Sequence, residues 1–429
     1  MGTSLDRSAL LGLVLCAGPL AVLAHGFFGA GSIVTGLLMA LPIAALILTG
    51  KWRGFSPNIC DALFAVVICC VAVSFIANGL GPDAKEPILL ALTVAAYPAA
   101  RLSERPFELK GLILVTGLVV TAGTLTTIPY LLQQWNDSHG KPFVFGLFDA
   151  APTQFSMALC IGLFAVASHA LTTKKAIMIS AAVALPTAVF AASMVRFTLL
   201  AMLVALGMGA LVGPREQRKP TLLMICLLAA IVVVGLVARA HTTMAYLDHF
   251  ATSAAFKGLR PDANLRSRPS DLIDKAMLRS SVPVVQSCEP IDIDNSLAIR
   301  KRLFKDAMEL LPSSSVAGIG LDGFAAATCL TGHPAHNTLF QTIIEIGWPG
   351  GVALVLLSFF ALGRKRLLSL AKISPEVHFV ICSLTFAMLI SLMYGRLSRD
   401  TALFLFLGYA AALRSESVRI AKGCPLGKT

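Results

Sequence analysis

The sequence predicts an all-α integral membrane protein, because apolar residues dominate it, charged residues are scarce, and the apolar residues gather in long runs. Of 429 residues, 56% are hydrophobic and 14% charged, with a mean hydropathy of +0.79. Soluble domains carry ~25% charged residues. A run of about 20 apolar residues spans a bilayer as a helix, which satisfies its own backbone hydrogen bonds. The formal net charge of +12 would suit nucleic acid, but the basic residues follow the membrane connectors, so we expect no nucleic-acid partner.

Twelve apolar runs are candidate spans, and the fourth and the last are the shortest. The first resembles a signal peptide, with Arg7 before it and Val22-Leu23-Ala24 as a possible cleavage site. A second run follows at once, so we expect the first to be retained, with cleavage as the alternative. The runs are residues 9–24, 27–49, 59–79, 87–100, 111–132, 153–172, 176–194, 197–213, 221–239, 346–363, 377–395 and 400–413.

The basic residues predict the orientation of these spans. If the N-terminus is cytoplasmic, every cytoplasmic connector carries Lys or Arg, whereas the opposite side holds chiefly Lys85 and Lys141. Both termini are then cytoplasmic. Arg196, Arg396 and Arg399 break this pattern on the outer side, which makes them candidates for function. The cytoplasmic basic residues are Lys51, Arg53, Arg101, Arg105, Lys110, Lys174, Lys175, Arg215, Arg218, Lys219, Arg364, Lys365, Arg366, Arg414, Arg419, Lys422 and Lys428.

One long polar segment interrupts the spans and divides the chain into three parts. Residues 1–239 hold nine spans, 240–345 form a large outer loop with short helices, and 346–429 hold three spans and a cytoplasmic tail. Within the loop, Asp294-Asn295-Ser296 predicts a helix N-cap, followed by a helix to Leu311.

One face of this predicted helix is apolar and includes an arginine. The apolar residues are Leu297, Phe304, Ala307 and Leu311, and Arg300 shares their stripe. A buried arginine needs an anionic partner, either an acidic side chain in a plain salt bridge or an anionic ligand. The solvated side is predicted to hold Arg302, Lys305, Asp306 and Glu309.

The cysteines predict one disulfide. Eight of the ten lie in or beside spans or in the cytoplasmic tail, and only Cys288 and Cys329 lie in the outer loop. Two thiols alone in an oxidising compartment normally pair. Closing this loop would stabilise the fold by roughly 3–4 kcal/mol in the chain-entropy description. No zinc-type spacing of Cys and His occurs, so we expect no metal.

Two motif matches fit their surroundings poorly. Gly318-Ile319-Gly320-Leu321-Asp322-Gly323 fits the dinucleotide pattern GxGxxG, but that pattern requires a preceding strand, so we interpret it as a glycine-rich turn. Asp292-Ile293-Asp294 fits the DxD pattern of enzymes that use nucleotide sugars. Those substrates are cytosolic whereas this segment is outside, so helix capping is favoured.

The stretch from Gly332 to Phe340 places His333, His336 and Asn337 where the outer loop meets the tenth span. Imidazole is the side chain best suited to moving protons near neutral pH, and polar groups at a membrane boundary are costly unless used. His336 is therefore the candidate chemical centre. The alternatives are a hydrogen-bonded histidine at a helix start and, for Asn337, a simple helix cap.

These residues carry a family resemblance. His336-Asn337 with Glu345, Gly347 and Gly350 looks like the "HN…E.G..G" signature of the O-antigen ligase and polymerase superfamily. Ser193-Met194-Val195-Arg196 resembles the family's "S.SR" element, and Arg300, Leu303-Phe304 and Gly318-Ile319-Gly320 resemble its "R…W…G.G" element. Met194-Val195 replaces small residues, and no Trp follows Arg300, so the resemblance is to a divergent member. It covers residues 190–352.

The resemblance implies a metal-independent, cofactor-free GT-C-like glycosyltransferase of the bacterial inner membrane, with its site facing the periplasm. The implied donor is a glycan on undecaprenyl pyrophosphate. Arginine binds phosphate in two-pronged fashion, which suits Arg196 and Arg300. His336 would take the acceptor's proton, and His333 and Asn337 would orient it or the acceptor. Further arginines that can contact the donor are Arg266, Arg268, Arg396 and Arg399.

The function that we expect is that of an O-antigen ligase in lipopolysaccharide biosynthesis, with lipid A–core as acceptor and membrane lipids around it. The first alternatives are an O-antigen polymerase and a protein O-oligosaccharyltransferase. From another class, a transporter or flippase of lipid-linked sugars would also show twelve spans. A transporter places its charged site near the bilayer midplane. Here the charged candidates lie at the outer rim, which favours the enzyme.

Overall fold

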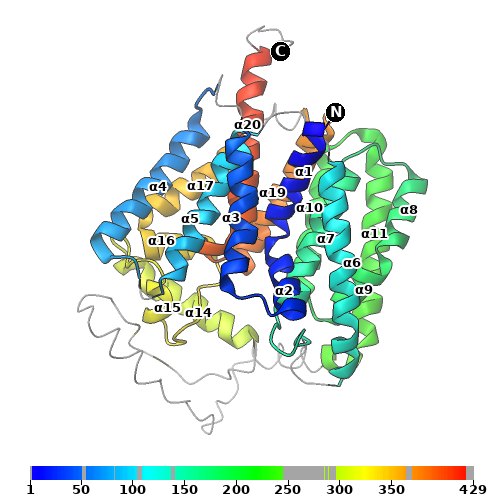
Figure 1. Ribbon diagram of the computed structural model, residues 1–429, viewed down its shortest axis with the longest axis horizontal. Coiled ribbons are helices and arrows are strands. Elements are labelled where there is room, and N and C mark those ends of the chain that lie inside the picture. The colour runs from blue at the N-terminus through cyan, green and yellow to red at the C-terminus, as the bar shows by residue number, and fades with distance from the viewer. Residues whose placement is uncertain are drawn as a thin grey trace.

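The fold, seen in a computed structural model, is helical throughout the part of the chain that the structure describes. That part comprises residues 2–50, 55–81, 83–103, 109–136, 141–244, 285, 288, 296–363 and 370–421. Within it the chain forms no β-strand beyond one isolated bridge between Val144 and Phe148. Figure 1 shows the helices packed side by side, most of them roughly parallel or antiparallel to one another.

The first eleven helices form the larger part of the bundle, and the later ones return to it after the outer segment. The first group is α1 (Gly2–Leu15), α2 (Ala17–Phe28), α3 (Ser32–Leu48), α4 (Ile59–Asn78), α5 (Lys85–Arg101), α6 (Lys110–Gln133), α7 (Ala151–Ala167), α8 (Thr173–Ala182), α9 (Ala184–Ala192), α10 (Arg196–Val212) and α11 (Arg215–Ala238). The second group is α14 (Ser296–Leu310), η1 (Leu311–Ser313), α15 (Gly323–Ala327), α16 (Thr338–Ile346), α17 (Trp348–Leu362), α19 (Pro375–Met393), η2 (Leu397–Arg399) and α20 (Thr401–Ala421).

The all-helical class is confirmed and candidate membrane spans are present, but their number is not fixed at twelve. Each predicted run overlaps a helix or a bent pair of helices. Four helices, α4, α6, α11 and α19, are long and apolar enough to cross a membrane, and the count rises to six if the bent pairs α1–α2 and α8–α9 each form one span. Five further apolar helices have only 10–17 residues. Twelve spans therefore remains a prediction.

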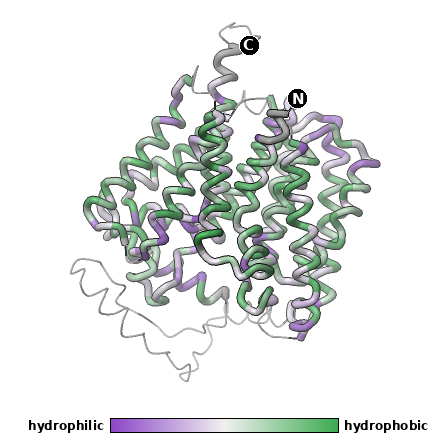
Figure 2. Tube along the Cα trace, viewed as in Figure 1, coloured by the Kyte–Doolittle hydropathy of each residue, from purple (hydrophilic) through white to green (hydrophobic). Residues whose placement is uncertain are grey.

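The arrangement of the helices agrees with termini on one side and the outer segment on the other. In Figure 1, α1 begins and α20 ends at the top of the molecule, whereas α14 and α15 lie at the bottom. Figure 2 shows hydrophobic residues along the helix bodies and hydrophilic residues gathered mainly at the two ends. Such a pattern is typical of a bundle whose middle faces lipid.

A buried ion pair holds α4 against α5 near the end at which the chain begins and ends. Arg101 donates from Nε and Nη2 to the two carboxylate oxygens of Asp61, at 2.8 and 3.0 Å. The Tyr97 hydroxyl donates to the same carboxylate at 3.0 Å. Asn58, which caps α4, donates to the Ala411 carbonyl of α20 at 2.9 Å. This network fixes α5, whose opposite end carries Glu86.

The part of the chain from α14 to α16 has a small hydrophobic core of its own. Leu303, Ala307 and Leu310 of α14 pack with Phe324 of α15 and Ile344 of α16. Burying large aliphatic and aromatic side chains stabilises such a core by about 1.5–3 kcal/mol each. α14 is thereby held against α16.

The predicted solvated face of α14 is wrong at two residues. Arg302 and Asp306 are buried, and Arg302 Nε lies 2.8 Å from the Asp306 carboxylate. Phe304, expected inside, is 52% exposed. The buried face is turned toward Arg302 because tertiary partners satisfy this pair: the Thr328 hydroxyl and the Cys329 amide donate to Asp306 at 2.5 and 3.0 Å. A self-neutralising, hydrogen-bonded pair can be buried where a lone charge cannot.

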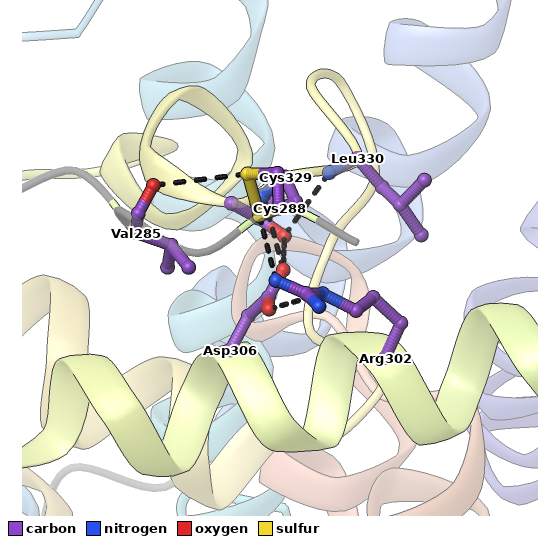
Figure 3. The surroundings of a disulfide bond; sticks show 7 residues. Val285, Cys288, Arg302, Asp306, Cys329 and Leu330 are labelled. Carbon is purple, nitrogen blue, oxygen red and sulfur yellow. Dashed lines mark hydrogen bonds and ion pairs between the residues drawn. A yellow bond between two sulfur atoms is a disulfide. The ribbon is translucent and has the colours of Figure 1, made fainter. Parts of the chain in front are cut away.

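The pair lies beside a disulfide (Figure 3). Cys288 and Cys329 are joined in the structure, with their Cα atoms 5.5 Å apart. Asp306 accepts from the Cys329 amide, so the disulfide and the ion pair anchor the same turn to α14. The seven other described cysteines are free, and they lie in helices except Cys16, which lies between α1 and α2.

The end of α16 packs backbone to backbone against the segment from Val316 to Gly320. The Ile319 and Gly320 amides donate to the Ile344 and Glu345 carbonyls at 2.9 and 3.0 Å. These carbonyls lie in the last turn of α16 and have no partner within the helix. Ser74 of α4 donates to the same Glu345 carbonyl at 2.8 Å. The glycine-rich stretch is thus a turn that follows α14 and η1, and the described residues before it form no strand of the kind that the dinucleotide pattern requires.

Glycines make this close approach possible. Gly318 and Gly347 have φ angles of +68° and +93°, which glycine adopts at low cost. A Cβ atom on Gly347 would lie 1.9 Å from the Val316 carbonyl oxygen.

Gly347→Ala is expected to lower the free energy of unfolding by about 3 kcal/mol or more, because backbone strain adds to a direct overlap with Val316. Gly332→Ala is the matched control: Gly332 has φ +88° but no atom within 4 Å of its Cβ position. It should cost only the left-handed strain, about 1–2 kcal/mol. Thermal or denaturant unfolding in detergent compares the two. Equal losses would contradict the close packing.

The predicted sidedness is tested by cysteine labelling in intact cells. Exposed Thr331 lies in the segment predicted to be outside, and exposed Lys219 lies in the first turns of α11, on the side predicted to be cytoplasmic. An impermeant maleimide should modify Thr331→Cys and spare Lys219→Cys until the membrane is permeabilised, with the parent protein as background. The reverse pattern would invert the topology.

Candidate active site

His336 immediately precedes α16 and has a backbone conformation unusual for its residue type. Its φ of +53° lies in the left-handed region, which costs a non-glycine residue on the order of 1 kcal/mol or more. Asn337, the next residue, caps α16 by accepting from the Leu339 and Phe340 amides at 3.0 and 3.1 Å. Thr338 donates to the buried carboxylate of Asp400. The cap expected for Asn337 is present, and it holds the strained backbone turn at His336 in place.

The imidazole of His336 is held neutral by its surroundings. Burial, followed by the positive charges of Arg300 and neighbouring basic groups, lowers the pKa of His336 from 6.5 to about 4. Its Nδ1 atom is buried without a hydrogen-bond partner among the described residues. The interpretation of His336 as a hydrogen-bonded structural histidine therefore has no support at Nδ1. A neutral, strained imidazole with a free nitrogen is suited to accept a proton from a ligand.

Arg300 is supported by aromatic rings rather than by an acid. Its guanidinium carbon lies 4.9 Å from the centre of the Phe197 ring and 4.7 Å from that of Tyr394. Phe197 comes from α10, and Tyr394 follows α19. No acidic side chain within the described residues forms an ion pair with Arg300. The plain salt bridge that the sequence left open is therefore not formed in this part of the chain. Cation–π contacts hold the side chain and leave its charge available to an anion.

Lys141 and Arg300 together form a cation cluster beside His336. The sequence assigned Lys141 no role. Its Nζ atom lies 3.4 Å from the Thr153 hydroxyl of α7 and 5.7 Å from the centre of the Tyr394 ring. Burial and, to a lesser extent, Arg300 lower the pKa of Lys141, with Asp149 acting in the opposite direction. The only signal in the sequence was a lysine on the side that the orientation rule leaves poor in basic residues.

Arg396 and Arg399, predicted to contact the donor, are engaged by acids. Arg396 Nη2 lies 2.7 Å from Asp322 and 3.2 Å from Glu86, and Arg399 Nη2 lies 3.0 Å from Glu86. Glu86 is only 2% exposed and also accepts from Ser398. Arg396 still contributes to the low pKa of His336, so it lies at the edge of the cluster. Arg399 is more than half exposed and serves the Glu86 network.

The other predicted residues lie at varying distances from this centre. Arg196 is the first residue of α10, next to Phe197, and its Nη2 atom contacts the Met194 sulfur at 3.2 Å. His333 is exposed, and its charge contributes to the low pKa of His336. Arg266, Arg268 and the Asp292-Ile293-Asp294 motif lie outside the described residues.

Glu345 of the signature connects α16, which follows His336, to α15. Its carboxyl accepts from Gln341 Nε2 at 3.0 Å and from the Phe324 amide at 3.4 Å. Complete burial raises the pKa of Glu345 to about 8, which leaves it mainly protonated at neutral pH. A neutral carboxyl avoids the cost of a buried charge while joining α16 to α15.

Two further observations on the described residues concern sites other than the cation cluster. No group of three or more His, Cys, Asp or Glu side chains among them is arranged to hold a metal ion. A groove of about 440 Å³ lies between α6, α7, α8 and α9, lined by residues such as Val120, Leu159 and Val183. Its lining is almost wholly apolar and contains no predicted site residue, so it does not suit a phosphate or a sugar.

The cation cluster predicts how His336 titrates. Because its folded pKa of about 4 lies below the ordinary 6.5, protonation favours the unfolded chain, and His336 weakens folding only as the pH falls from about 6.5 to about 4. Arg300→Gln should raise the pKa of His336, without restoring 6.5, because burial is the larger cause. Lys305→Gln, an exposed residue of the same helix, is the charge-matched control.

NMR of 15N-histidine-labelled protein measures this titration, with His336→Gln to assign the signal. A His336 pKa at or above 6.5 in the ligand-free protein, or one unaffected by Arg300→Gln, would contradict the electrostatic description.

The comparison with known proteins agrees with the motifs. Residues 181–355 match the family described as O-antigen ligase. This range includes Arg196, Arg300 and His336, whereas Lys141, Tyr394 and Arg396 lie beyond its ends. No curated protein and no solved structure matches the chain. The matched range carries the histidine signature and both motif arginines, and over this range the chain is similar to the O-antigen ligase family.

Proposed function

We propose that this protein is a glycosyltransferase that moves an O-antigen polysaccharide from undecaprenyl pyrophosphate to a sugar hydroxyl of lipid A–core, on the periplasmic side of the bacterial inner membrane. One observation carries the proposal: a neutral, partly buried His336 whose pKa is lowered chiefly by burial and next by Arg300, which itself has no acidic partner among the described residues. The similarity of residues 181–355 to the O-antigen ligase family supports the reaction class.

The histidine suits the acceptor side of the reaction. An acceptor hydroxyl attacks the anomeric carbon of the donor sugar and passes its proton to a neutral imidazole nitrogen. Nδ1 of His336 is buried without a partner in the described part of the chain, so a hydroxyl that reaches it on binding would satisfy it. When an anionic donor is bound, its negative charge raises the pKa of the imidazole, which then becomes a stronger base.

The cations suit the leaving-group side. As the bond between the anomeric carbon and the phosphate oxygen breaks, undecaprenyl pyrophosphate leaves with the electron pair and gains negative charge. Fixed cations that are already in place stabilise this charge without reorganisation. Arg300 is held by the Phe197 and Tyr394 rings, and Arg196 begins α10 beside Phe197. The residues assigned to the donor are therefore Arg300 and Arg196, with Arg396 at the rim.

Neighbouring functions share much of this geometry. A polymerase would use the same donor with a second lipid-linked chain as acceptor, and a protein O-oligosaccharyltransferase would use a protein hydroxyl. A transporter of lipid-linked sugars would place its charged site near the bilayer midplane, whereas these cations are predicted to lie at the outer rim. The choice of acceptor is therefore the point that experiments must decide.

His336→Ala should slow transfer by about 10²–10⁴-fold, because it removes the proton acceptor, while donor binding is retained. Arg300→Lys should be defective although its charge is unchanged, because it loses the two-pronged geometry and the planar contact with the rings. The assay uses purified protein, a lipid-linked donor and rough lipopolysaccharide. His169→Ala is the control, since His169 is exposed at the far end of α7. Near-normal transfer by His336→Ala would remove the histidine from the mechanism.

A deletion strain separates ligase from polymerase. Loss of a ligase should leave lipid-linked polymer to accumulate while lipopolysaccharide stays uncapped. A single repeat unit on the core would instead assign the protein as a polymerase.

A further inference from the structure

We propose that Lys141, held against Tyr394, makes the donor site selective for a diphosphate-linked lipid over a monophosphate-linked one. The inference rests on the proposed function, and it names a specificity residue outside the region that carries the family match. Neither Lys141 nor Tyr394 belongs to any of the three sequence motifs.

The position of Lys141 is fixed by two independent elements. It follows α6 in the connection to α7, and its ammonium group lies 3.4 Å from the Thr153 hydroxyl in the first turn of α7. From the other side, the Tyr394 ring lies 5.7 Å from Nζ. Lysine side chains usually extend into water, because holding one in place costs rotamer entropy. The ammonium group of Lys141, partly buried between a hydroxyl and a ring, is therefore a positive charge with a fixed position.

Tyr394 connects this lysine to the arginine of the site. The same ring lies 4.7 Å from the Arg300 guanidinium carbon, so one aromatic side chain supports both cations. Phe197 supports Arg300 from α10. The two positive groups thus come from a loop near α7 and from α14, and Tyr394 sets their spacing.

The two cations have no acid between them to cancel their charge. No described acidic side chain forms an ion pair with Lys141 or Arg300, although Asp149 is close enough to favour the charged lysine. Glu86 and Asp322 are engaged with Arg396 and Arg399 instead. Like charges held together cost free energy in the empty site, and an anion that contacts both removes that cost.

The charge of the ligand then decides selectivity. A diphosphate bridge between a sugar and a lipid carries two negative charges at neutral pH, one on each phosphate, whereas a monophosphate bridge carries one. Arg300 alone can pair with one phosphate. A second cation at a fixed spacing adds a contact that only the diphosphate can use fully. The same contact stabilises the departing pyrophosphate as its charge grows.

Binding of farnesyl pyrophosphate and of farnesyl monophosphate to the full-length protein in detergent tests the inference. The natural sequence should prefer the pyrophosphate. Lys141→Gln should weaken pyrophosphate binding by about tenfold or more, as expected for loss of a charge-assisted contact, and monophosphate binding by much less. Lys85→Gln is the matched control, because Lys85 is exposed at the start of α5 on the same side of the molecule. It should change neither affinity.

Two variants at Tyr394 test the role of the ring. Tyr394→Phe keeps the ring and should keep the preference, whereas Tyr394→Leu should reduce it. Lys141→Arg, which retains the charge, should keep part of the preference, and a normal unfolding temperature for each variant excludes misfolding as the cause. Equal losses for both ligands, or no loss, in a folded Lys141→Gln protein would overturn the inference.

A transfer assay separates this inference from the proposed function. If the natural sequence transfers glycan but Lys141→Gln leaves the preference unchanged, the inference fails and the function stands. If no glycan is transferred to any hydroxyl acceptor, yet Lys141→Gln still abolishes the preference for pyrophosphate, the function fails and the selectivity site stands.

Discussion

The segment from Val316 to Gly320 lies against the end of α16 more closely than side chains would allow, and the position of α14 relative to the helix bundle depends on this contact. The Ile319 and Gly320 amides satisfy two carbonyls at the C-terminus of α16, and Ser74 of α4 shares one of them. The contact joins the bundle to the small core that carries α14. Because His336 lies at one end of α16 and Arg300 on α14, the same contact sets their relative position.

The distribution of acids determines which basic residues remain available to a ligand. Glu86 and Asp322 take up Arg396 and Arg399, and Asp306 takes up Arg302. Aromatic rings, which carry no net charge, support Arg300 and Lys141. Rings fix a cation without cancelling it, whereas carboxylates do both. The positive charge beside His336 therefore depends on which basic residues the acidic side chains pair with, as well as on where the basic residues lie.

Strain and cation proximity both converge on His336. Its left-handed backbone is held by the Asn337 cap, and its imidazole is kept neutral by burial and by the basic groups around it. Neither feature benefits the fold of an empty site. Under the proposed function, both serve a ligand that brings negative charge and a hydroxyl proton, as a lipid-linked glycan and its acceptor together would.

The sequence by itself determined the all-helical class, the apolar helices and the family resemblance, because apolar run length and short motifs are local properties; the outer position of residues 240–345 and the roles of His336 and Arg300 stay predictions. Only the tertiary structure decided which face of α14 is buried, since Arg302 and Asp306 enter the core through partners at Thr328 and Cys329. It alone brought Lys141 and Tyr394 to Arg300 from distant elements and withdrew Arg396 and Arg399 into ion pairs. Whether a charged side chain forms an ion pair depends on which side chains meet across the fold, and no local sequence pattern encodes those contacts.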